Sequence, residues 1–407
     1  MKILVLNSGS SSQKACLYEL NAAPPDSPPK PLWKGNLEWR EDRGTLDVQT
    51  SSGLSTKQDL QRGERSAATE QLLQALVSGK TGVLKSLSEI DVAGHRIVNG
   101  GRAYSHPTLI TPEVKTAIEK MAVFAPLHNR VELAGIALVE KLCGSVPQVA
   151  VFDTGFHSEL PEEASVYPGP YEWAERGIRK FGFHGINHQY CAGRAAHLLG
   201  KDLATLKLIT CHLGNGCSLA AILGGKSIET TMGFTPLDGL MMGTRSGSVD
   251  PGILTFLLQE GHTDGKSLDA TLNTKSGLLG ISGISGDMRE IVSAMLSGNP
   301  RAKLAFDMFV HRLRAGIGAM LAALDGADAL VFTAGIGENS PEVRAAACSH
   351  FTFLGLALDP AKNAAATPDQ DISTATSQLR VLVIRAEEDW AIARKCWKLI
   401  SNRQPRH

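Results

Sequence analysis

The sequence predicts an α/β protein that contains two duplicated domains with a cleft between them. Three observations support this prediction. The chain has 407 residues, enough for two domains that each bury a core. Short β-forming runs alternate with helical stretches along its length. One pattern, an apolar strand, a small polar turn with glycine and a second apolar strand, occurs at residues 3–20 and again at 206–225, so that each copy opens one half of the chain.

The first copy, ILVLNSGSSSQKACLYEL, leaves two interpretations open. Ser, Gly and Asn are ordinary turn residues, so the segment fits a simple β-hairpin. Alternatively, the backbone N–H groups and hydroxyls of the turn bind phosphate oxygens, and Lys14 supplies a cation. A Walker A loop is excluded, because no glycine precedes Lys14 and the residues after it continue as a strand.

The remainder of the first half follows the same α/β alternation. Prolines make residues 22–31 a surface loop between strands, and the polar stretch 48–66 is expected to form turns and a sheet edge. The apolar spacing predicts an amphipathic helix over 69–79 that ends at Gly79. The next elements are expected as a strand, a helix and a strand at residues 90–98, 131–144 and 146–154.

In the second half, residues 329–348 predict a strand, a glycine-rich loop at 335–339 and a helix. Ser340 is the expected N-cap, Pro341 the first helical residue, and Glu342 lies in the first turn. Glycines between a strand and a helix N-terminus let a ligand approach the backbone closely. The third glycine of a dinucleotide fingerprint is missing. With the two hairpin turns, this makes three loops that point to nucleotide phosphates.

Composition limits the function classes. Lys plus Arg and Asp plus Glu both number 41, so no basic field attracts nucleic acid or an anionic membrane. The seven cysteines are scattered and form no C-x-x-C pair, which favours reduced thiols over disulfides or a zinc site. The start of the chain has too few apolar residues for a signal peptide, and no apolar run is long enough to span a bilayer. We therefore expect a cytoplasmic protein.

Several ionisable side chains stand where apolar runs end. They are Arg96, Asp153, His184, His188 and Arg245. Each has an ordinary structural interpretation, since an arginine among glycines is usually solvated and a histidine beside phenylalanines usually belongs to the core. Taken singly, none of them establishes a site.

A series of motifs in this sequence resembles, in residues and in order, the motifs of the acetate kinase (acetokinase) family. The motifs are NSGSSSQK, GHRIVNGG, APLHN, VFDTGFH, FGFHGINH, CHLGNGCS, MGFTPLDGLMMGTRSGSVDPG, SGISGDMR and GIGEN. The resemblance covers the chain from Ile3 to about Cys396 and is weakest between Ala22 and Ser66. The 21-residue block around Arg245 is among its most specific parts.

The resemblance implies the superfold of acetate and sugar kinases, Hsp70 and actin. Two duplicated actin-like (ribonuclease H-like) domains then flank an ATP cleft, and two chains pair as a homodimer. The N-terminal domain would comprise residues 1–155, joined by a C-terminal helix at about 388–401. The C-terminal domain, 156–387, would carry most of the nucleotide site.

The implied reaction is the reversible transfer of the ATP γ-phosphoryl group to acetate, giving acetyl phosphate and ADP. Mg²⁺ is the implied cofactor, with Mn²⁺ as an alternative. Acetate is already ionised at neutral pH, so a strong general base is unnecessary. Orientation and charge neutralisation must then supply most of the catalysis of a direct in-line transfer.

The resemblance also assigns roles to residues. The catalytic group comprises Asp153, His184 and Arg245. The acetate site comprises Arg96, which would bind the carboxylate, and the methyl-pocket residues Val98, Leu127, Phe183 and Pro236. The ATP site comprises Lys14, His212, Leu213, Gly214, Asn215, Gly216, Asp287, Met288, Arg289, Gly335, Ile336, Gly337, Glu338 and Asn339. The metal ligands are Asn7 and Glu388. For Asp153, an acid/base role and a role in ordering metal-bound water or an arginine both remain open.

Some positions depart from the family pattern. Asn99 stands where the family generally has histidine, beside the carboxylate pocket, and leaves the acyl preference open. Glu387 is adjacent to Glu388 and is an alternative metal ligand. Propionate or butyrate are alternative substrates, because one methylene changes pocket binding by only about 1–3 kcal/mol. A non-catalytic ATP-binding switch of the actin–Hsp70 type is an alternative in another class.

Overall fold

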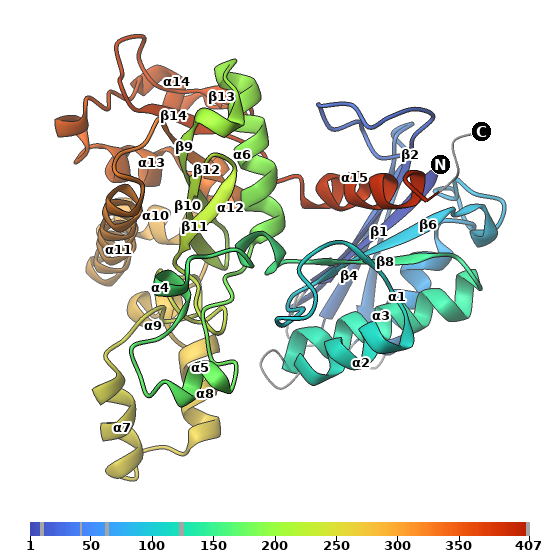
Figure 1. The fold of residues 1–407 in the computed structure, drawn as a ribbon, viewed down its shortest axis with the longest axis horizontal. Helices are drawn as coiled ribbons and strands as arrows, with labels where there is room; N and C mark the ends of the chain where they lie inside the picture. Colours follow the sequence, from blue (N-terminus) through green and yellow to red (C-terminus); the bar gives the residue numbers. More distant parts are fainter. Residues whose placement is uncertain (9–11, 41–42, 62–64, 122–125, 404–407) are drawn as a thin grey trace. The chain divides into compact units, whose positions relative to one another are not determined.

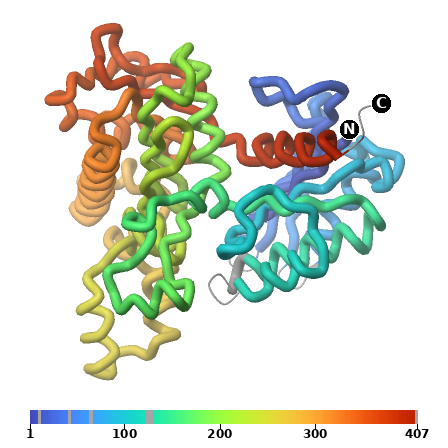
Figure 2. The backbone as a smooth tube through the Cα atoms, viewed as in Figure 1, coloured from blue at the N-terminus to red at the C-terminus, as the bar shows by residue number. Residues whose placement is uncertain are grey.

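The computed structural model describes residues 1–8, 12–40, 43–61, 65–121 and 126–403, and the side chains of residues 40, 65–66 and 126–128 also lie outside this description. The chain divides into two compact units (Figures 1 and 2). Unit 1 comprises Met1–Gly155 and Glu387–His407, and unit 2 comprises Phe156–Ala386.

Unit 1 contains one mixed sheet. Its strands are β1 (Lys2–Ser8), β2 (Ser12–Glu19), β3 (Trp33–Arg40), β4 (Arg43–Thr50), β5 (Ser55–Gln61), β6 (Val92–Ile97), β7 (Thr108–Leu109) and β8 (Gln148–Phe152), in the order β5-β4-β3-β2-β1-β6-β8-β7. β1 and β2 pair antiparallel, as expected of the N-terminal hairpin, whereas β1, β6 and β8 are parallel. The carboxyl ends of these three parallel strands therefore meet at one edge of the sheet.

Helices cover both faces of this sheet. They are α1 (Arg65–Gln74), α2 (Pro112–Met121), α3 (Pro126–Cys143) and α15 (Glu388–Ser401). Figure 1 shows α15 on one face and α1 and α3 on the other. Every residue of β8 is buried, which explains its continuous apolar run. The C-terminal helix thus completes the layer structure that the first 155 residues begin.

Unit 2 repeats this arrangement with a second sheet. Its strands are β9 (Lys207–Leu213), β10 (Cys217–Leu223), β11 (Lys226–Thr230), β12 (Ala329–Thr333), β13 (Gln370–Asp371) and β14 (Arg380–Val383), in the order β11-β10-β9-β12-β14-β13. β9 and β10 form an antiparallel hairpin, and β9, β12 and β14 are parallel. The pattern β2-β1-β6-β8 of unit 1 therefore recurs as β10-β9-β12-β14, which agrees with a duplicated fold.

The helices of unit 2 are more numerous. They are α4 (Glu162–Ser165), α5 (Glu172–Glu175), α6 (Gly185–Leu199), α7 (Pro251–Gln259), α8 (Gly265–Thr274), α9 (Gly277–Ser282), α10 (Met288–Leu296), α11 (Pro300–Leu324), α12 (Ala334–Asn339), α13 (Pro341–Cys348) and α14 (Pro360–Ala364). Short 3-10 turns lie at Leu87–Glu89, Gly155–His157, Leu203–Thr205 and Thr352–Leu354. Figure 1 shows α6 on one side of the second sheet and the long α11 on the other.

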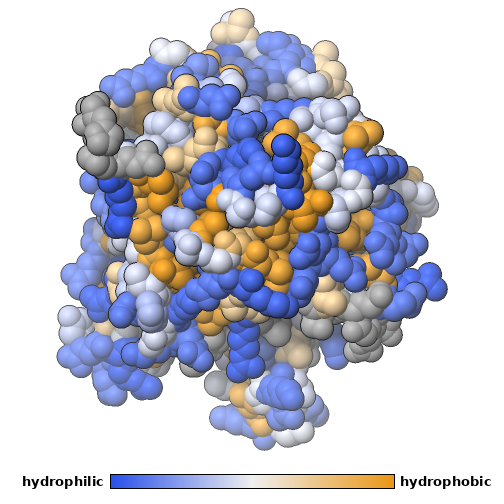
Figure 3. Space-filling model, turned by 90° about the vertical axis from the view of Figure 1, so that its right-hand side faces the viewer, coloured by the Kyte–Doolittle hydropathy of each residue, from blue (hydrophilic) through white to orange (hydrophobic). Residues whose placement is uncertain are grey.

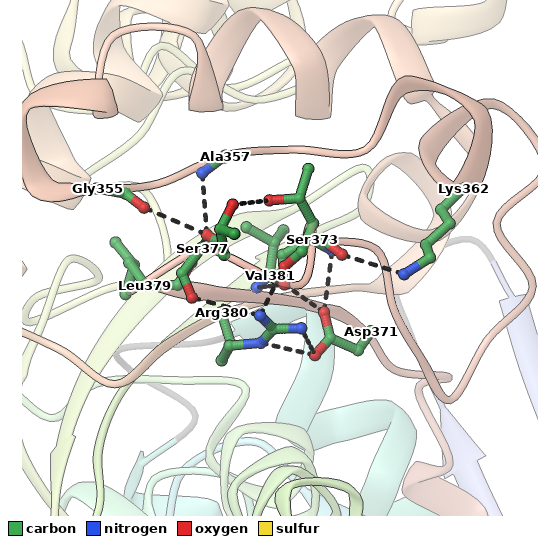
Figure 4. Close-up of polar contacts among 11 residues, drawn as sticks. Gly355, Ala357, Lys362, Asp371, Ser373, Ser377, Leu379, Arg380 and Val381 are labelled. Atoms are coloured by element: carbon green, nitrogen blue, oxygen red, sulfur yellow. Dashed lines mark hydrogen bonds and ion pairs between the residues drawn. The ribbon is translucent and has the colours of Figure 1, made fainter.

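A polar network fixes the outer edge of the second sheet (Figure 4). Arg380 on β14 donates from Nε to the Asp371 carboxylate on β13 at 2.8 Å, and from Nη1 to the carbonyl oxygen of Thr374 at 2.8 Å. Such fork-shaped contacts hold an arginine in one geometry. This arginine is structural, and it is a useful contrast to those of the candidate site.

The face drawn in Figure 3 is mixed: apolar residues gather near its middle, and hydrophilic residues lie around them. In the described part of the chain, no helix is long and apolar enough to cross a membrane. All seven cysteines are free and buried.

Two local predictions need correction. The helix expected over 69–79 is α1, which ends at Gln74, because the N–H groups of Leu76 and Val77 turn back to carbonyls three residues earlier. Residues 335–339, expected as a loop, lie in the short helix α12. The predicted cap of the next helix is confirmed: Ser340 Oγ accepts the N–H of Val343, and Pro341 opens α13.

Candidate active site

The candidate site residues of unit 1 lie at the carboxyl ends of its parallel strands. Asn7 is the penultimate residue of β1, Arg96 that of β6, and Asp153 follows β8 directly. The register aligns Leu6 with His95 and Arg96 with Val151, so the three positions are neighbours on one sheet edge. In open α/β sheets, ligands bind at this edge.

Arg96 and Asp153 form a buried ion pair. Arg96 Nη2 donates to Asp153 Oδ2 at 2.8 Å, and their side chains are 12% and 0% exposed. Burial disfavours the Arg96 cation, but Asp153, Glu388 and Glu132 together raise its pKa above the ordinary value. Nε of Arg96 is buried and has no hydrogen-bond partner among the described residues, so this guanidinium retains a donor for a ligand.

Asn7 contacts two carboxylates at the start of α15. Its Nδ2 donates to Glu388 Oε2 and to Asp389 Oδ1, both at 3.0 Å. Burial raises the pKa of Glu388, Asp153 and Asp389 add to the shift, and Arg96 and Asn7 oppose it. The sequence motifs did not single out Asp389. Its only signal is its position in the first turn of the helix that Glu388 begins.

The chemistry of these side chains fits a hard divalent cation. Amide and carboxylate oxygens are the ligands that Mg²⁺ prefers, and Mg²⁺ is commonly held by one or two carboxylates together with substrate phosphates. Among the residues that the structure describes, no group of three or more His, Cys, Asp or Glu side chains forms a metal cage. The amide of Asn7 and the carboxylate of Glu388, which contact each other, belong to this class of ligands.

Two further ionisable groups, Glu132 and Lys395, lie near Arg96 and Asp153. Both oxygens of the buried Glu132 on α3 accept the N–H of Val98, at 3.1 and 3.2 Å. Burial raises the pKa of Glu132 to about 8 despite opposing effects of Arg96 and the Val98 N–H. Burial also lowers the pKa of Lys395 on α15 to about 8, with Asp153 opposing. Neither was predicted, because a charged residue on a helix ordinarily faces solvent.

The remaining predicted residues of unit 1 are placed as follows. Val98 is buried directly after β6, and Asn99 beside it accepts the Gly101 N–H while its own Nδ2 has no partner among the described residues. Lys14 is exposed on β2, opposite Asn7. Leu127 falls where side chains lie outside the described part of the chain.

In unit 2, His184 stands at the N-terminus of α6 with a left-handed backbone, φ 58°. A non-glycine residue in this region is strained, and such strain clusters at functional sites. Its ring stacks on His212 with centroids 3.9 Å apart and planes inclined by 11°. Its Nδ1 lies 2.8 Å from Ser218 Oγ. The ring is thus held by two neighbours from the β9–β10 hairpin.

Arg245 lies close to the same histidine. Its Nη1 donates to the carbonyl oxygen of Pro236 at 3.0 Å. A Cβ atom added to Gly216 would lie 3.3 Å from Arg245 Nη1 and 3.4 Å from His184 Cε1, so this glycine borders both side chains. The predicted pocket residue Phe183 is buried just before His184. Arg245, His184 and Gly216, three predicted site residues, therefore meet within unit 2.

Unit 2 also contains a cavity of about 600 Å³. Eight predicted ATP-site residues line it: Gly214, Asn215, Asp287, Met288, Arg289, Gly335, Ile336 and Asn339. Gly286, Val292, Ser340, Pro341 and Glu342 also line it and were not predicted as ligand residues. Segments more than a hundred residues apart in sequence thus form one pocket, large enough for a nucleotide.

Of the predicted ATP-site residues in unit 2, five do not line this cavity: His212, Leu213, Gly216, Gly337 and Glu338. Glu338 has a structural contact instead, since its Oε1 accepts the N–H groups of Ala334 and Ala386 at 2.9 and 2.8 Å. Burial raises its pKa. These bonds stabilise the tight α12 turn, where Ala334 has a φ of 64°.

The two units thus repeat one α/β arrangement, with a buried ion pair at a strand edge of unit 1 and a glycine-bordered cavity in unit 2. The Acetokinase family profile matches residues 2–394. The chain belongs to the acetokinase family.

Curated relatives and solved structures agree with this assignment. The acetate kinase of Gloeobacter violaceus is 58% identical over 98% of this chain and 99% of its own, and that of Trichormus variabilis is 56% identical over 98% and 100%. The crystal structure of Porphyromonas gingivalis acetate kinase has a TM-score of 0.88 at 40% identity, covering 98% of this chain and 99% of that one. A propionate kinase from Francisella tularensis has a TM-score of 0.88 at 36% identity over the same shares.

Proposed function

We propose that this chain is an acetate kinase that transfers the ATP γ-phosphoryl group reversibly to acetate, giving acetyl phosphate and ADP. The observation that carries the proposal is the Arg96–Asp153 pair at the ligand-binding edge of the first sheet, in a chain so similar to acetate kinases. A buried guanidinium with an unused Nε donor is suited to a small carboxylate. A nucleotide switch has no need of such a group.

The cavity of unit 2 holds the nucleotide in this proposal. Gly214, Gly286 and Gly335 let the ligand approach the backbone, and Asn215 and Asn339 supply amide groups. Arg289 is exposed and is held by the Asp287 carboxylate, with its Nε donating at 3.0 Å. It can therefore border the nucleotide without being buried as an unpaired charge.

Asn7 and Glu388 would hold Mg²⁺, or Mn²⁺ in its place. The cation would neutralise phosphate charge that accumulates during transfer. The chain's contribution is to hold both ligands in place: α15 begins at Glu388, and Asn7 is fixed in the first strand. Lys14, opposite Asn7, would meet the nucleotide phosphates from the second strand of the hairpin.

The acceptor and the phosphoryl group are assigned to different side chains. Arg96 would bind the acetate carboxylate, and the family resemblance assigns the methyl group to Val98, Leu127, Phe183 and Pro236. Asp153 orients Arg96 and accepts no proton from acetate, because acetate is ionised already. His184 and Arg245 donate to the non-bridging phosphoryl oxygens, where charge is spread during in-line transfer.

Assembly and localisation are proposed from exposed apolar residues and from the cysteines. Helix α7 and the segment before it expose Val249, Ile253, Phe256 and Leu258, at 36% to 57%. An exposed apolar helix of this kind suits burial against a second copy of the chain, as expected of a homodimer. The free, buried cysteines suit a reducing cytoplasm.

Propionate kinase is the second candidate function, since a propionate kinase shares the fold at a TM-score of 0.88. Trapping of the acyl phosphate as hydroxamate, with acetate, propionate and butyrate compared at equal concentrations, separates the candidates. We expect kcat/KM to fall from acetate to propionate to butyrate. A higher value for propionate or butyrate would reassign the substrate, and ATP binding without any acyl phosphate would favour the nucleotide switch.

A further inference from the structure

Four side chains of unit 2 form a continuous buried chain of hydrogen bonds that ends at His184. Ser218 Oγ lies 2.8 Å from His184 Nδ1 and 2.7 Å from His188 Nε2. His188 Nδ1 lies 2.6 Å from Thr210 Oγ1. Thr210, His188 and Ser218 are all 0% exposed. Water therefore cannot replace a hydrogen-bond partner within this chain.

The local structure explains why these residues meet. His184 and His188 are four residues apart at the start of α6, so they lie on one face of the helix. Thr210 and His212 are two residues apart on β9 and point to the same face of the sheet, and Ser218 on β10 pairs with His212. Helix α6 packs on this face, and the polar residues form a seam between helix and hairpin.

The protons in this chain can be arranged in only two ways when both imidazoles are neutral. Burial lowers the pKa of His188 well below its ordinary value, with His157 and His212 adding to the shift, so His188 carries a single N–H. Ser218 has one proton and must donate to one histidine while it accepts from the other. The two histidines must therefore carry their protons on the same ring position.

The place of the one remaining donor separates the two arrangements. In the first, Thr210 donates to His188 Nδ1, His188 Nε2–H donates to Ser218, and Ser218 donates to His184 Nδ1. Every proton of the three fully buried residues is then used, and the remaining N–H lies on Nε2 of the half-buried His184. In the reverse, His188 Nδ1–H donates to Thr210, whose own hydroxyl proton then has no acceptor among the described residues. A buried donor without a partner is costly, so the first arrangement is favoured.

We propose that Thr210, His188 and Ser218 are positioning residues that hold His184 as its Nε2–H tautomer, so that it presents an N–H to the phosphoryl group. The inference rests on the role of His184 in the proposed function. The opposite neutral tautomer would present a lone pair and repel phosphoryl oxygens. Stacking on His212 fixes the plane of the ring, and the hydrogen-bond chain fixes which nitrogen carries the proton.

The direct test is histidine tautomer measurement by NMR. The full-length chain, labelled with ¹⁵N-histidine and free of substrates, is observed at pH 8 through two-bond ¹H–¹⁵N correlations. Spectra of His184→Gln and His188→Gln assign the signals. We expect both residues to be protonated on Nε2 alone. An Nδ1 proton on either residue, or different tautomers for the two, would overturn the proposal.

Kinetics of variants supply a second readout. Ser218→Ala breaks the chain and should lower kcat about tenfold or more, while the KM for ATP stays within about threefold, because only a transition-state donor is misplaced. Thr210→Val removes the terminal donor and should lower kcat less, and Thr210→Ser should restore it. The matched control is Ser227→Ala: Ser227 is equally buried and bonds His157 Nδ1 at 2.7 Å, outside this chain.

The outcomes are distinguishable from failure of the proposed function. Tautomers are measured without turnover, so Nε2–H signals in a protein that makes no acetyl phosphate would contradict only the function. Should Ser218→Ala not fold, Thr210→Val and the wild-type spectrum still decide. Equal kcat losses in Ser227→Ala and Ser218→Ala, or no rescue by Thr210→Ser, would overturn the positioning role.

Discussion

The two units stabilise buried polar groups in opposite ways. At the edge of the first sheet, the cation of Arg96 is compensated by the buried carboxylate of Asp153 at 2.8 Å. Around His184, hydroxyl groups and imidazole rings bond one another, with Ser218 Oγ between His184 and His188. The cluster around Arg96 should therefore be sensitive to the loss of a charge or a proton. The cluster around His184 should be sensitive to the loss of hydrogen-bond direction.

The largest expected effect tests whether Arg245 in unit 2 acts through the directed hydrogen bonds of its guanidinium group. Arg245→Lys keeps the positive charge but loses the planar fork, so kcat should fall about 10²-fold or more while the KM for ATP changes a few-fold. Steady-state kinetics of acetyl phosphate formation measure it. The matched control is Arg380→Lys, which disrupts a structural fork (Figure 4) and should lower thermal stability with little change in kcat. Near-normal kcat in a folded Arg245→Lys protein would make Arg245 an ordinary loop arginine.

The second prediction concerns the cation in unit 1. Glu388→Ala should raise the Mg²⁺ concentration needed for half-maximal activity by about 10- to 100-fold, by analogy with the loss of groups that orient a metal site. Glu387→Ala is the matched neighbour and should have a much smaller effect, because the Asn7 amide contacts Glu388. Magnesium titrations of both variants decide between them. The reverse ranking would move the metal ligand to Glu387.

The third prediction tests charge at the acceptor site. Arg96→Lys keeps a cation beside Asp153 but cannot bind a carboxylate in the same two-pronged way, so the KM for acetate should rise about tenfold while that for ATP is nearly unchanged. Arg96→Met is the harsher variant. It removes the guanidinium that pairs with the buried Asp153 and should lower stability by about 3–5 kcal/mol. A change in the KM for ATP alone would contradict the assignment.

The smallest effect concerns protonation of Glu132. Its pKa in the fold is about 8, against 4.5 ordinarily, so the protonated carboxyl stabilises the fold fully below pH 4.5 and loses this benefit as pH rises toward 8. Glu132→Gln does not titrate. Relative to wild type, the variant should therefore gain up to about 1.4 kcal/mol of stability per pH unit across this window.

Urea unfolding at several pH values between 5 and 9 measures the difference between the two proteins. Glu119→Gln, which removes one carboxyl group at an exposed position on α2, serves as the control. If the difference for Glu132→Gln were independent of pH, Glu132 would not be held protonated by the fold.

The sequence predicted the architecture because the relevant signals are local. Alternating apolar runs gave β6, α3 and β8, and the two similar hairpins gave β1–β2 and β9–β10. Ser340 and Pro341 gave the start of α13. The two local corrections, the end of α1 and the helix α12, occur where a backbone turn depends on hydrogen bonds formed several residues away.

The sequence by itself determined the α/β class and the duplication, and through family resemblance it proposed Arg96, Asp153, His184 and Arg245 as site residues. Only the tertiary structure decided which of them are neighbours, because burial and proximity follow from strand order and helix packing. It made Arg96 an ion-pair partner of Asp153, brought Glu132 onto the Val98 backbone, and joined Thr210 to His184 through His188 and Ser218. No local pattern marks such groups, since their chemistry arises only when distant segments exclude water around them.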